Sequence, residues 1–160
     1  MKTFNSRESG FSLIELITVM AIIAILAGVS IFALAGSRET ARDARRKADM
    51  QGIASALELF KADCNYYPNA LPSAGSALTG GAAPCSLSSN TYKEVIPDDP
   101  LTADQDYAYV PLPSGCDSTN NCTRYKIWAT LEDPGTVPAG CPLPAPSCGT
   151  PDCNYCVLNP

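Results

Sequence analysis

The apolar residues of this chain are concentrated near its N-terminus. Between residues 11 and 36 the sequence carries a single charged side chain, Glu15, and residues 16–35 are largely Ile, Leu, Val, Ala and Met. A helix rises ~1.5 Å per residue, so about 20 residues reach ~30 Å, the thickness of the hydrocarbon core of a bilayer. The pattern therefore predicts a membrane-spanning helix over residues 11–37.

Residues 38–63 are more polar but keep a helical pattern. They contain no Pro and a single Gly, and they are rich in the good helix formers Ala, Arg, Glu, Lys, Leu and Gln. Apolar side chains recur at alternating steps of three and four residues, which places them on one helix face: Met50, Ile53, Leu57, Phe60 and Cys64. We expect one helix from residue 11 to about residue 63, whose amphipathic half packs against the domain that follows rather than lining a cofactor groove.

Beyond Pro68 the sequence changes to short candidate strands separated by loops. Residues 69–90 are rich in Ala, Ser, Gly, Pro and Asn, which predicts a connecting loop within an αβ segment, 64–91. Strands are predicted where β-branched and aromatic residues gather, at 92–96, 107–110 and 125–131. Three short strands indicate one small antiparallel sheet stacked on the amphipathic half of the helix, which makes residues 64–160 a globular head of α+β fold.

The C-terminal tail, residues 134–160, has an unusual composition. It holds seven Pro and four Cys, so we expect no regular core element of any length there, and covalent bridges must supply the order. Of the eight Cys in the chain, the favoured pairs are Cys64 with Cys85 and Cys116 with Cys122. The three pairings within the tail stay open: they involve Cys141, Cys148, Cys153 and Cys156.

The rest of the composition narrows the function classes. The chain has no His, which excludes His-based acid–base catalysis, Cys/His or Ser/His nucleophile pairs and zinc sites made of Cys and His. A four-thiolate zinc site is the competing interpretation of the tail, because Cys153-x-x-Cys156 is half of a zinc pattern. Disulfides are favoured for an exported chain. We expect no catalytic site, no cofactor and no metal.

Charge is distributed unevenly along the chain. Of the formal net charge of −5, residues 64–160 contribute three basic and nine acidic side chains. An acidic head repels a phosphate backbone, so we expect it to bind no nucleic acid. Four carboxylates gather in one segment that lacks the spacing of a calcium-binding EF-hand, and we interpret it as a solvated acidic turn: Asp98, Asp99, Asp104 and Asp106.

The start of the apolar segment carries two unusual features. A secretory signal peptide has its small-residue cleavage site after the apolar stretch, whereas Gly10 lies before it. Glu15 lies inside the stretch, where a carboxylate costs roughly 2.5–3.5 kcal/mol on membrane-insertion scales. That cost favours a paired, functional Glu15 over an incidental one.

The segment SGFSLIEL, residues 9–16, closely resembles the processing site of the type IV pilin and type II secretion pseudopilin superfamily. The resemblance implies that a prepilin peptidase removes residues 1–10 by cutting between Gly10 and Phe11, and that Phe11 is then methylated. It also implies that Glu15 neutralises the N-terminal amine of a neighbouring subunit during filament assembly. Electrostatics supports this role, because opposite charges attract strongly at low dielectric while either one alone is penalised.

The sequence thus predicts a structural filament subunit with the pilin fold. Its helix is held in the inner membrane, its head lies outside the cytoplasm because the cysteines need an oxidising compartment, and it polymerises with copies of itself through the N-terminal helix. The resemblance implies three partners: the prepilin peptidase, an assembly ATPase and a membrane platform protein. Pilin, pseudopilin and minor or DNA-uptake pilin remain open. The alternative from another class is a monomeric, membrane-anchored extracytoplasmic domain that binds a ligand or a metal.

Overall fold

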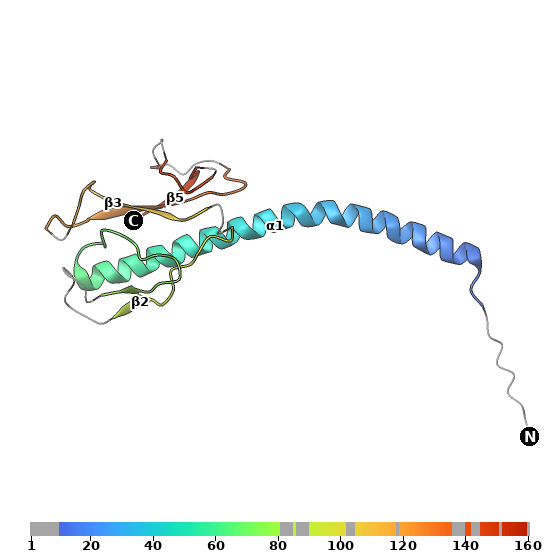
Figure 1. Cartoon of the computed structure of the whole chain (residues 1–160), viewed down its shortest axis with the longest axis horizontal. Helices are drawn as coiled ribbons and strands as arrows, with labels where there is room; N and C mark the ends of the chain where they lie inside the picture. Colours follow the sequence, from blue (N-terminus) through green and yellow to red (C-terminus); the bar gives the residue numbers. More distant parts are fainter. Residues whose placement is uncertain are drawn as a thin grey trace, which may run out of the picture. The chain divides into compact units, whose positions relative to one another are not determined.

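A computed structural model describes residues 10–80, 85, 90–101, 105–117, 119–135, 140–141, 145–150 and 152–159 (Figure 1). The chain divides into two compact units, Met1–Arg38 and Glu39–Pro160. One helix, α1 (Leu13–Cys64), runs through both, which confirms the predicted long helix with a start two residues later than expected. It ends at Asn65, which adopts a left-handed φ of 63° and donates its N–H to the Lys61 carbonyl at 2.7 Å.

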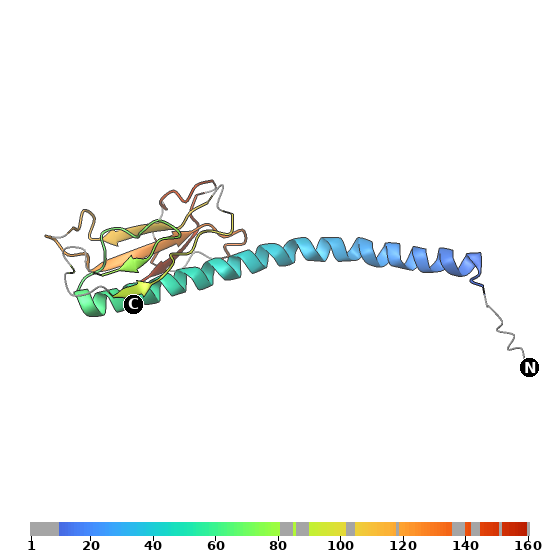
Figure 2. The ribbon, with the colours of Figure 1, turned by 60° about the horizontal axis from the view of Figure 1, so that its bottom comes forward.

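The second unit combines the C-terminal half of α1 with two small antiparallel sheets (Figures 1 and 2). One sheet has three strands in the order β3-β4-β5. The other pairs β1 with β2. The strand bounds are β1 Leu78–Thr79, β2 Thr91–Lys93, β3 Ala108–Leu112, β4 Arg124–Ala129 and β5 Tyr155–Leu158. The predicted α+β class is confirmed, although the prediction of a single sheet is wrong.

Two segments differ from the sequence-based expectation. The segment around Tyr92 does not join the main sheet but pairs with β1, which lies inside the predicted loop 69–90. The tail, expected to hold no regular element, contributes β5, which pairs with β4 from Lys126↔Leu158 to Ala129↔Tyr155. Residues 155–158, Tyr-Cys-Val-Leu, are a Pro-free run of strand-forming residues, and β4 offers them a free edge.

The main core lies between α1 and the inner face of the three-stranded sheet. All five apolar positions predicted for one helix face are buried: Met50, Ile53, Leu57, Phe60 and Cys64. They share a cluster with Tyr125, Ile127 and Ala129, which alternate along β4 and so point to the same side of the sheet. The predicted packing of the amphipathic half of the helix on the head is therefore confirmed.

The outer face of the sheet is covered around Trp128. Trp128, the only Trp in the sequence, is 2% exposed and lies in a second cluster with the four tail cysteines. Within the tail, Cys141 is bonded to Cys156, and Cys148 is bonded to Cys153. The disulfide-bonded tail therefore covers this part of the sheet, a role that a helix has in a larger domain.

The other two bridges are the pairs that the sequence favours, Cys64–Cys85 and Cys116–Cys122. Every Cys of the chain is therefore in a disulfide. The sulfurs of Cys153 and Cys156 are bonded to different partners, so they do not form the four-thiolate set that was the competing interpretation of the tail.

Candidate functional site

The expected processing site lies just before α1 begins. Gly10 is exposed and not helical, and α1 starts three residues later at Leu13. The Ser12 carbonyl accepts the N–H groups of Glu15 at 3.1 Å and Leu16 at 3.2 Å, which closes the first turn. The bond between Gly10 and Phe11 therefore lies in exposed backbone outside the helix, where a peptidase can reach it.

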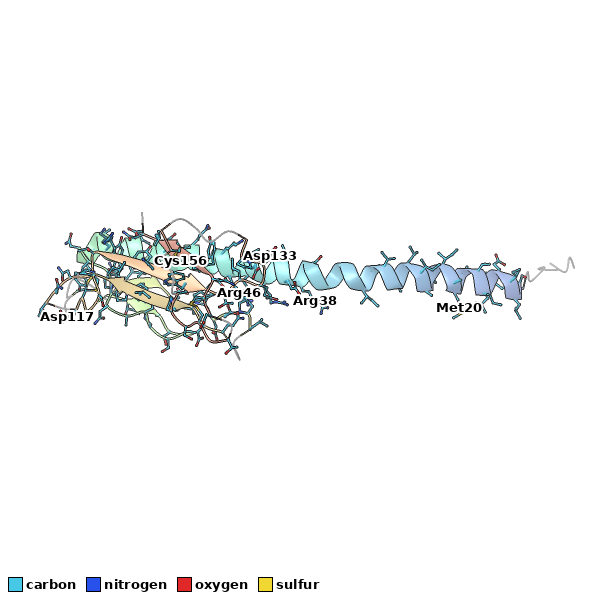
Figure 3. The ribbon with its side chains drawn as sticks, turned by 90° about the horizontal axis from the view of Figure 1, so that it is seen from above. Met20, Arg38, Arg46, Asp117, Asp133 and Cys156 are labelled. Atoms are coloured by element: carbon cyan, nitrogen blue, oxygen red, sulfur yellow. A yellow bond between two sulfur atoms is a disulfide. The ribbon has the colours of Figure 1, made fainter. Side chains whose placement is uncertain are left out.

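The first part of α1 is an apolar rod. Its large side chains stand out from the helix on all sides, as Figure 3 shows around Met20. Phe11 is 87% exposed. Twelve further large apolar side chains are also exposed, each to a smaller fraction: Leu13, Ile14, Leu16, Ile17, Val19, Met20, Ile22, Ile23, Ile25, Leu26, Val29 and Ile31. A helix that is apolar all round has its place in a membrane or in a bundle of similar helices. Among the described residues, α1 is the one helix long and apolar enough to span a bilayer.

Glu15 is placed in the first turn of this rod. Its carboxylate is exposed and makes no hydrogen bond or ion pair within the part of the chain that the structure describes. The helix dipole favours a negative charge at this end by about 0.3–1 kcal/mol, much less than the cost of burying the charge in lipid. An oppositely charged group from outside the chain can remove that cost.

A second group of charges lies within the head, and it was not predicted from the sequence. Arg46 is fully buried on the helix face that packs against the sheet. Five hydrogen bonds use all five of its N–H donors. The acceptors are Asp99 Oδ2 at 2.8 Å, Asp99 Oδ1 at 3.0 Å, Asp43 Oδ1 at 2.8 Å, Gln105 Oε1 at 3.0 Å and Glu132 Oε1 at 3.0 Å. We call Arg42, Asp43, Arg46, Asp99, Gln105 and Glu132 the Arg46 cluster.

The Arg46 cluster connects three segments that are distant in sequence. Asp43 accepts the backbone N–H groups of Glu132 at 3.0 Å and Asp133 at 2.8 Å, and Arg42 forms a bidentate ion pair with Glu132. The helix is thereby joined to the loop before β3 and to the turn after β4. Figure 3 shows Arg46 near Asp133 at one end of the head, with Asp117 at the opposite end.

These contacts shift two ionisation equilibria. The hydrogen bond from Arg42, reinforced by Arg46, lowers the pKa of Glu132 to about 2. The hydrogen bond to Asp99 raises the pKa of Arg46 above its ordinary value, against the opposing effect of burial. The ion pairs that Glu132 makes with Arg42 and Arg46 therefore persist over the whole physiological pH range.

The interpretation of residues 98–106 as a solvated acidic turn is wrong for Asp99, which is 2% exposed and bound to Arg46. Asp98 and Asp106 are exposed as expected, and Asp104 lies outside the described residues. The helix periodicity carries a signal of this cluster. Continued backward from Met50 in steps of four and three, the apolar face reaches Arg46 and Asp43.

Comparisons with known proteins address the N-terminal site. Residues 5–31 match the family model described as the prokaryotic N-terminal methylation motif. The type II secretion system core protein G of Aeromonas hydrophila is 32% identical over 97 residues, which are 59% of this chain and 68% of that protein. The chain belongs to the type IV pilin and type II secretion pseudopilin superfamily.

Other members are similar to the chain to comparable degrees. The type II secretion system core protein G of Pseudomonas aeruginosa is 31% identical over 97 residues, 59% of this chain and 68% of that protein. The Escherichia coli protein of the same name is 31% identical over 64 residues, 40% of this chain and 44% of that protein. No solved structure is significantly similar to the chain. The methylation motif spans Gly10, Phe11 and Glu15, the residues that the sequence singles out in this pilin-like chain.

The Arg46 cluster predicts how the stability of this pilin-like head depends on pH. Because folding lowers the pKa of Glu132 from 4.5 to about 2, its contribution is complete above pH 4.5 and is lost as the pH falls toward 2. As the pH falls from 4.5 to about 2, the natural chain should lose the free energy of unfolding that ionised Glu132 contributes. Glu132→Gln has no such carboxylate, so its free energy of unfolding should fall by about 1–2 kcal/mol less over the same range. Thermal unfolding of the detergent-solubilised chain, followed by Trp128 fluorescence, measures the difference. Glu94→Gln, at an exposed carboxylate, is the matched control; identical pH profiles for all three proteins would contradict the prediction.

Proposed function

We propose that the chain is a structural, non-catalytic subunit of a type II secretion pseudopilus that polymerises through its N-terminal helix. One observation carries the proposal: Glu15 is the single charged residue in the exposed apolar part of a helix that begins two residues beyond the Gly10–Phe11 bond. A monomer gains nothing from an unpaired carboxylate at that depth, whereas a polymer of processed chains offers each Glu15 a cationic chain end.

The proposed assembly reaction is physical. Removal of residues 1–10 creates the amine of Phe11, and the helices then leave lipid for a bundle of the same helices, where each Glu15 pairs with the Phe11 amine of a neighbour. Small residues along the rod, such as Ala21, Ala24 and Gly28, allow the helices to approach closely. The contact joins two different surfaces of successive copies. When such a contact is repeated and does not close into a ring, the copies form a fibre.

The location and partners follow from the same proposal. Residues 11–37 span the inner membrane before assembly, and residues 38–63 continue the helix into a head on the extracytoplasmic side, where four disulfides can form. A prepilin peptidase, an assembly ATPase and a membrane platform protein serve the assembly, as implied by the family. The names of the similar proteins favour a pseudopilus over a pilus.

Mass spectrometry of the chain extracted from membranes tests the proposal. We expect a mature chain that has lost residues 1–10, carries one added methyl group on Phe11 and holds four disulfides. A host lacking the prepilin peptidase is the control, and it should yield the full-length chain. An intact Met1 in a host with the peptidase would contradict processing and favour the monomeric, membrane-anchored binding domain instead.

A further inference from the structure

We propose that successive copies of this chain also contact each other through two oppositely charged surfaces of the head, an acidic groove and a basic patch. The acidic groove is lined by Asp98 and Asp106 together with four apolar side chains: Ile53, Leu71, Ile96 and Tyr109. The basic patch is formed by Arg124 and Lys126 of β4. This inference rests on the proposed function, because only a polymer brings the two surfaces together.

The acidic groove is suited to a long cationic side chain. It encloses about 580 Å³ between α1, the loop after Pro68 and the start of β3. Asp98 and Asp106 are exposed, and neither has an ion pair with any described residue. An Arg or Lys side chain lays an aliphatic stem on apolar surface and places its charge in a polar setting. An apolar floor next to two carboxylates provides both halves of that environment.

The basic patch provides side chains of that kind. Arg124 and Lys126 are two residues apart on β4, so they point to the same side of the sheet. Leu112 and Leu158 from the neighbouring strands lie beside them. Arg124 is exposed, and neither cation has an ion pair with any described residue. Three arginines of the head, by contrast, already form ion pairs inside the molecule: Arg42, Arg45 and Arg46.

The two surfaces lie on opposite sides of the three-stranded sheet. Tyr107 and Tyr109 border the groove and pack against the core that faces α1. Lys126 and Trp128 alternate with the inward-facing residues of β4, and Trp128 packs under the tail on the other side. One molecule cannot bring its own patch to its own groove. A second copy can, and a contact between two different surfaces repeats along a fibre.

Charge reversal with rescue tests this contact in cells that assemble the filament. Asp98→Asn with Asp106→Lys reverses the sign of the groove and keeps a side-chain oxygen for the Asp99 N–H, which Asp98 binds at 3.0 Å. Arg124→Glu with Lys126→Glu reverses the patch. We expect each pair of substitutions to lower the amount of subunit in sheared filaments about tenfold, and all four together to restore it to within about twofold of the natural chain. Glu94→Lys, a reversal outside both surfaces, should have no effect.

Cross-linking provides a second measurement that is independent of filament yield. Filaments of a chain carrying both Asp106→Cys and Lys126→Cys should form a covalent ladder of subunits under oxidation, and chains with either substitution alone should not. The melting temperature followed by Trp128 fluorescence checks that each variant is folded.

Normal filament yield from both reversed variants, no recovery in the combined variant, or no ladder would each overturn the inference. None of these results touches the proposed function, as long as the natural chain assembles and its assembly depends on Glu15. Absence of the natural chain from filaments would overturn both.

Discussion

A Glu15→Ala chain is expected to insert into the membrane as well as the natural chain but to leave no measurable subunit in the filament fraction. Removing the carboxylate spares roughly 2.5–3.5 kcal/mol of insertion cost, so the membrane pool should not fall. In the filament the Phe11 amine of each neighbour would lose its counter-charge in a low-dielectric bundle. A loss of about 3 kcal/mol per contact corresponds to a more than hundredfold weaker association. Quantitative immunoblots of sheared filaments and membranes measure both pools.

Two further variants make the Glu15 result specific. Glu15→Gln keeps the size and hydrogen-bonding capacity of the side chain but not its charge, so it should fail in the same way if the ion pair is what matters. Glu39→Ala removes an exposed carboxylate beyond the apolar rod and should assemble normally. Mass spectrometry of the Glu15 variants must show the leader removed, since an unprocessed chain could not assemble for a different reason. Normal filaments from Glu15→Ala would refute the pairing.

The second large effect is expected from Arg46→Met, a substitution that preserves most of the side-chain volume. It would leave the buried carboxylates of Asp43 and Asp99 without their guanidinium partner. Breaking a buried ion pair by removing one partner costs about 3–5 kcal/mol, a large fraction of the stability of a small domain. Thermal or denaturant unfolding of the detergent-solubilised chain, followed by Trp128 fluorescence, measures the loss.

The neighbouring arginine is a matched control for Arg46. The Arg45 side chain is 65% exposed and approaches Asp49 at 3.7 Å, so Arg45→Met should cost less than about 1 kcal/mol. Arg46→Lys should lie between the two Met variants, because an ammonium keeps the charge but cannot make the two-pronged contact with Asp99. If Arg46→Met and Arg45→Met were equally stable, the Arg46 cluster would not hold the head together.

The long helix and its packing could be predicted because their signals are local and repeated. The apolar run that ends near residue 36 has the length of a bilayer, and five positions from Met50 to Cys64 repeat a spacing of three and four. On β4 the signal is the strand period of two, which places the buried Tyr125 and Ile127 on the same side of the sheet. Each of these patterns accumulates over many residues, so a single unusual residue does not hide it.

Strand pairing could not be predicted in the same way. Leu78–Thr79 is too short to show any period, and its one buried anchor, Leu78, is surrounded by residues typical of loops. β5 is only four residues long and follows a proline-rich segment, and its place is shown only by its pairing with β4 and by the bond between Cys156 and Cys141. Contacts of this kind depend on where distant segments meet, which no local pattern contains.

The candidate sites illustrate the same distinction. Gly10, Phe11 and Glu15 are recognisable because their chemistry lies in adjacent residues, so the family motif covers all three. Asp99 is one of four carboxylates in an acidic stretch, and nothing local separates it from Asp98. Its burial is decided by Arg46, which is 53 residues away. The lesson is that a charged residue in phase with an apolar helix face predicts a buried partner somewhere in the chain.

The connectivity of the cysteines bears on the order of events at the membrane. In three of the four disulfides, a cysteine is bonded to the next cysteine in the sequence. The exception is Cys141, which is bonded to Cys156, the last cysteine of the chain, so the loop closed by Cys148–Cys153 lies within the loop closed by Cys141–Cys156. If the head emerges from the membrane starting with residue 39, a catalyst that oxidises thiols in order of appearance makes the first two native bonds and then joins Cys141 to Cys148. Only the disulfides of the tail therefore need a disulfide isomerase to reach their native pairing. A host without this enzyme should accumulate subunits whose non-native disulfides all lie beyond residue 140.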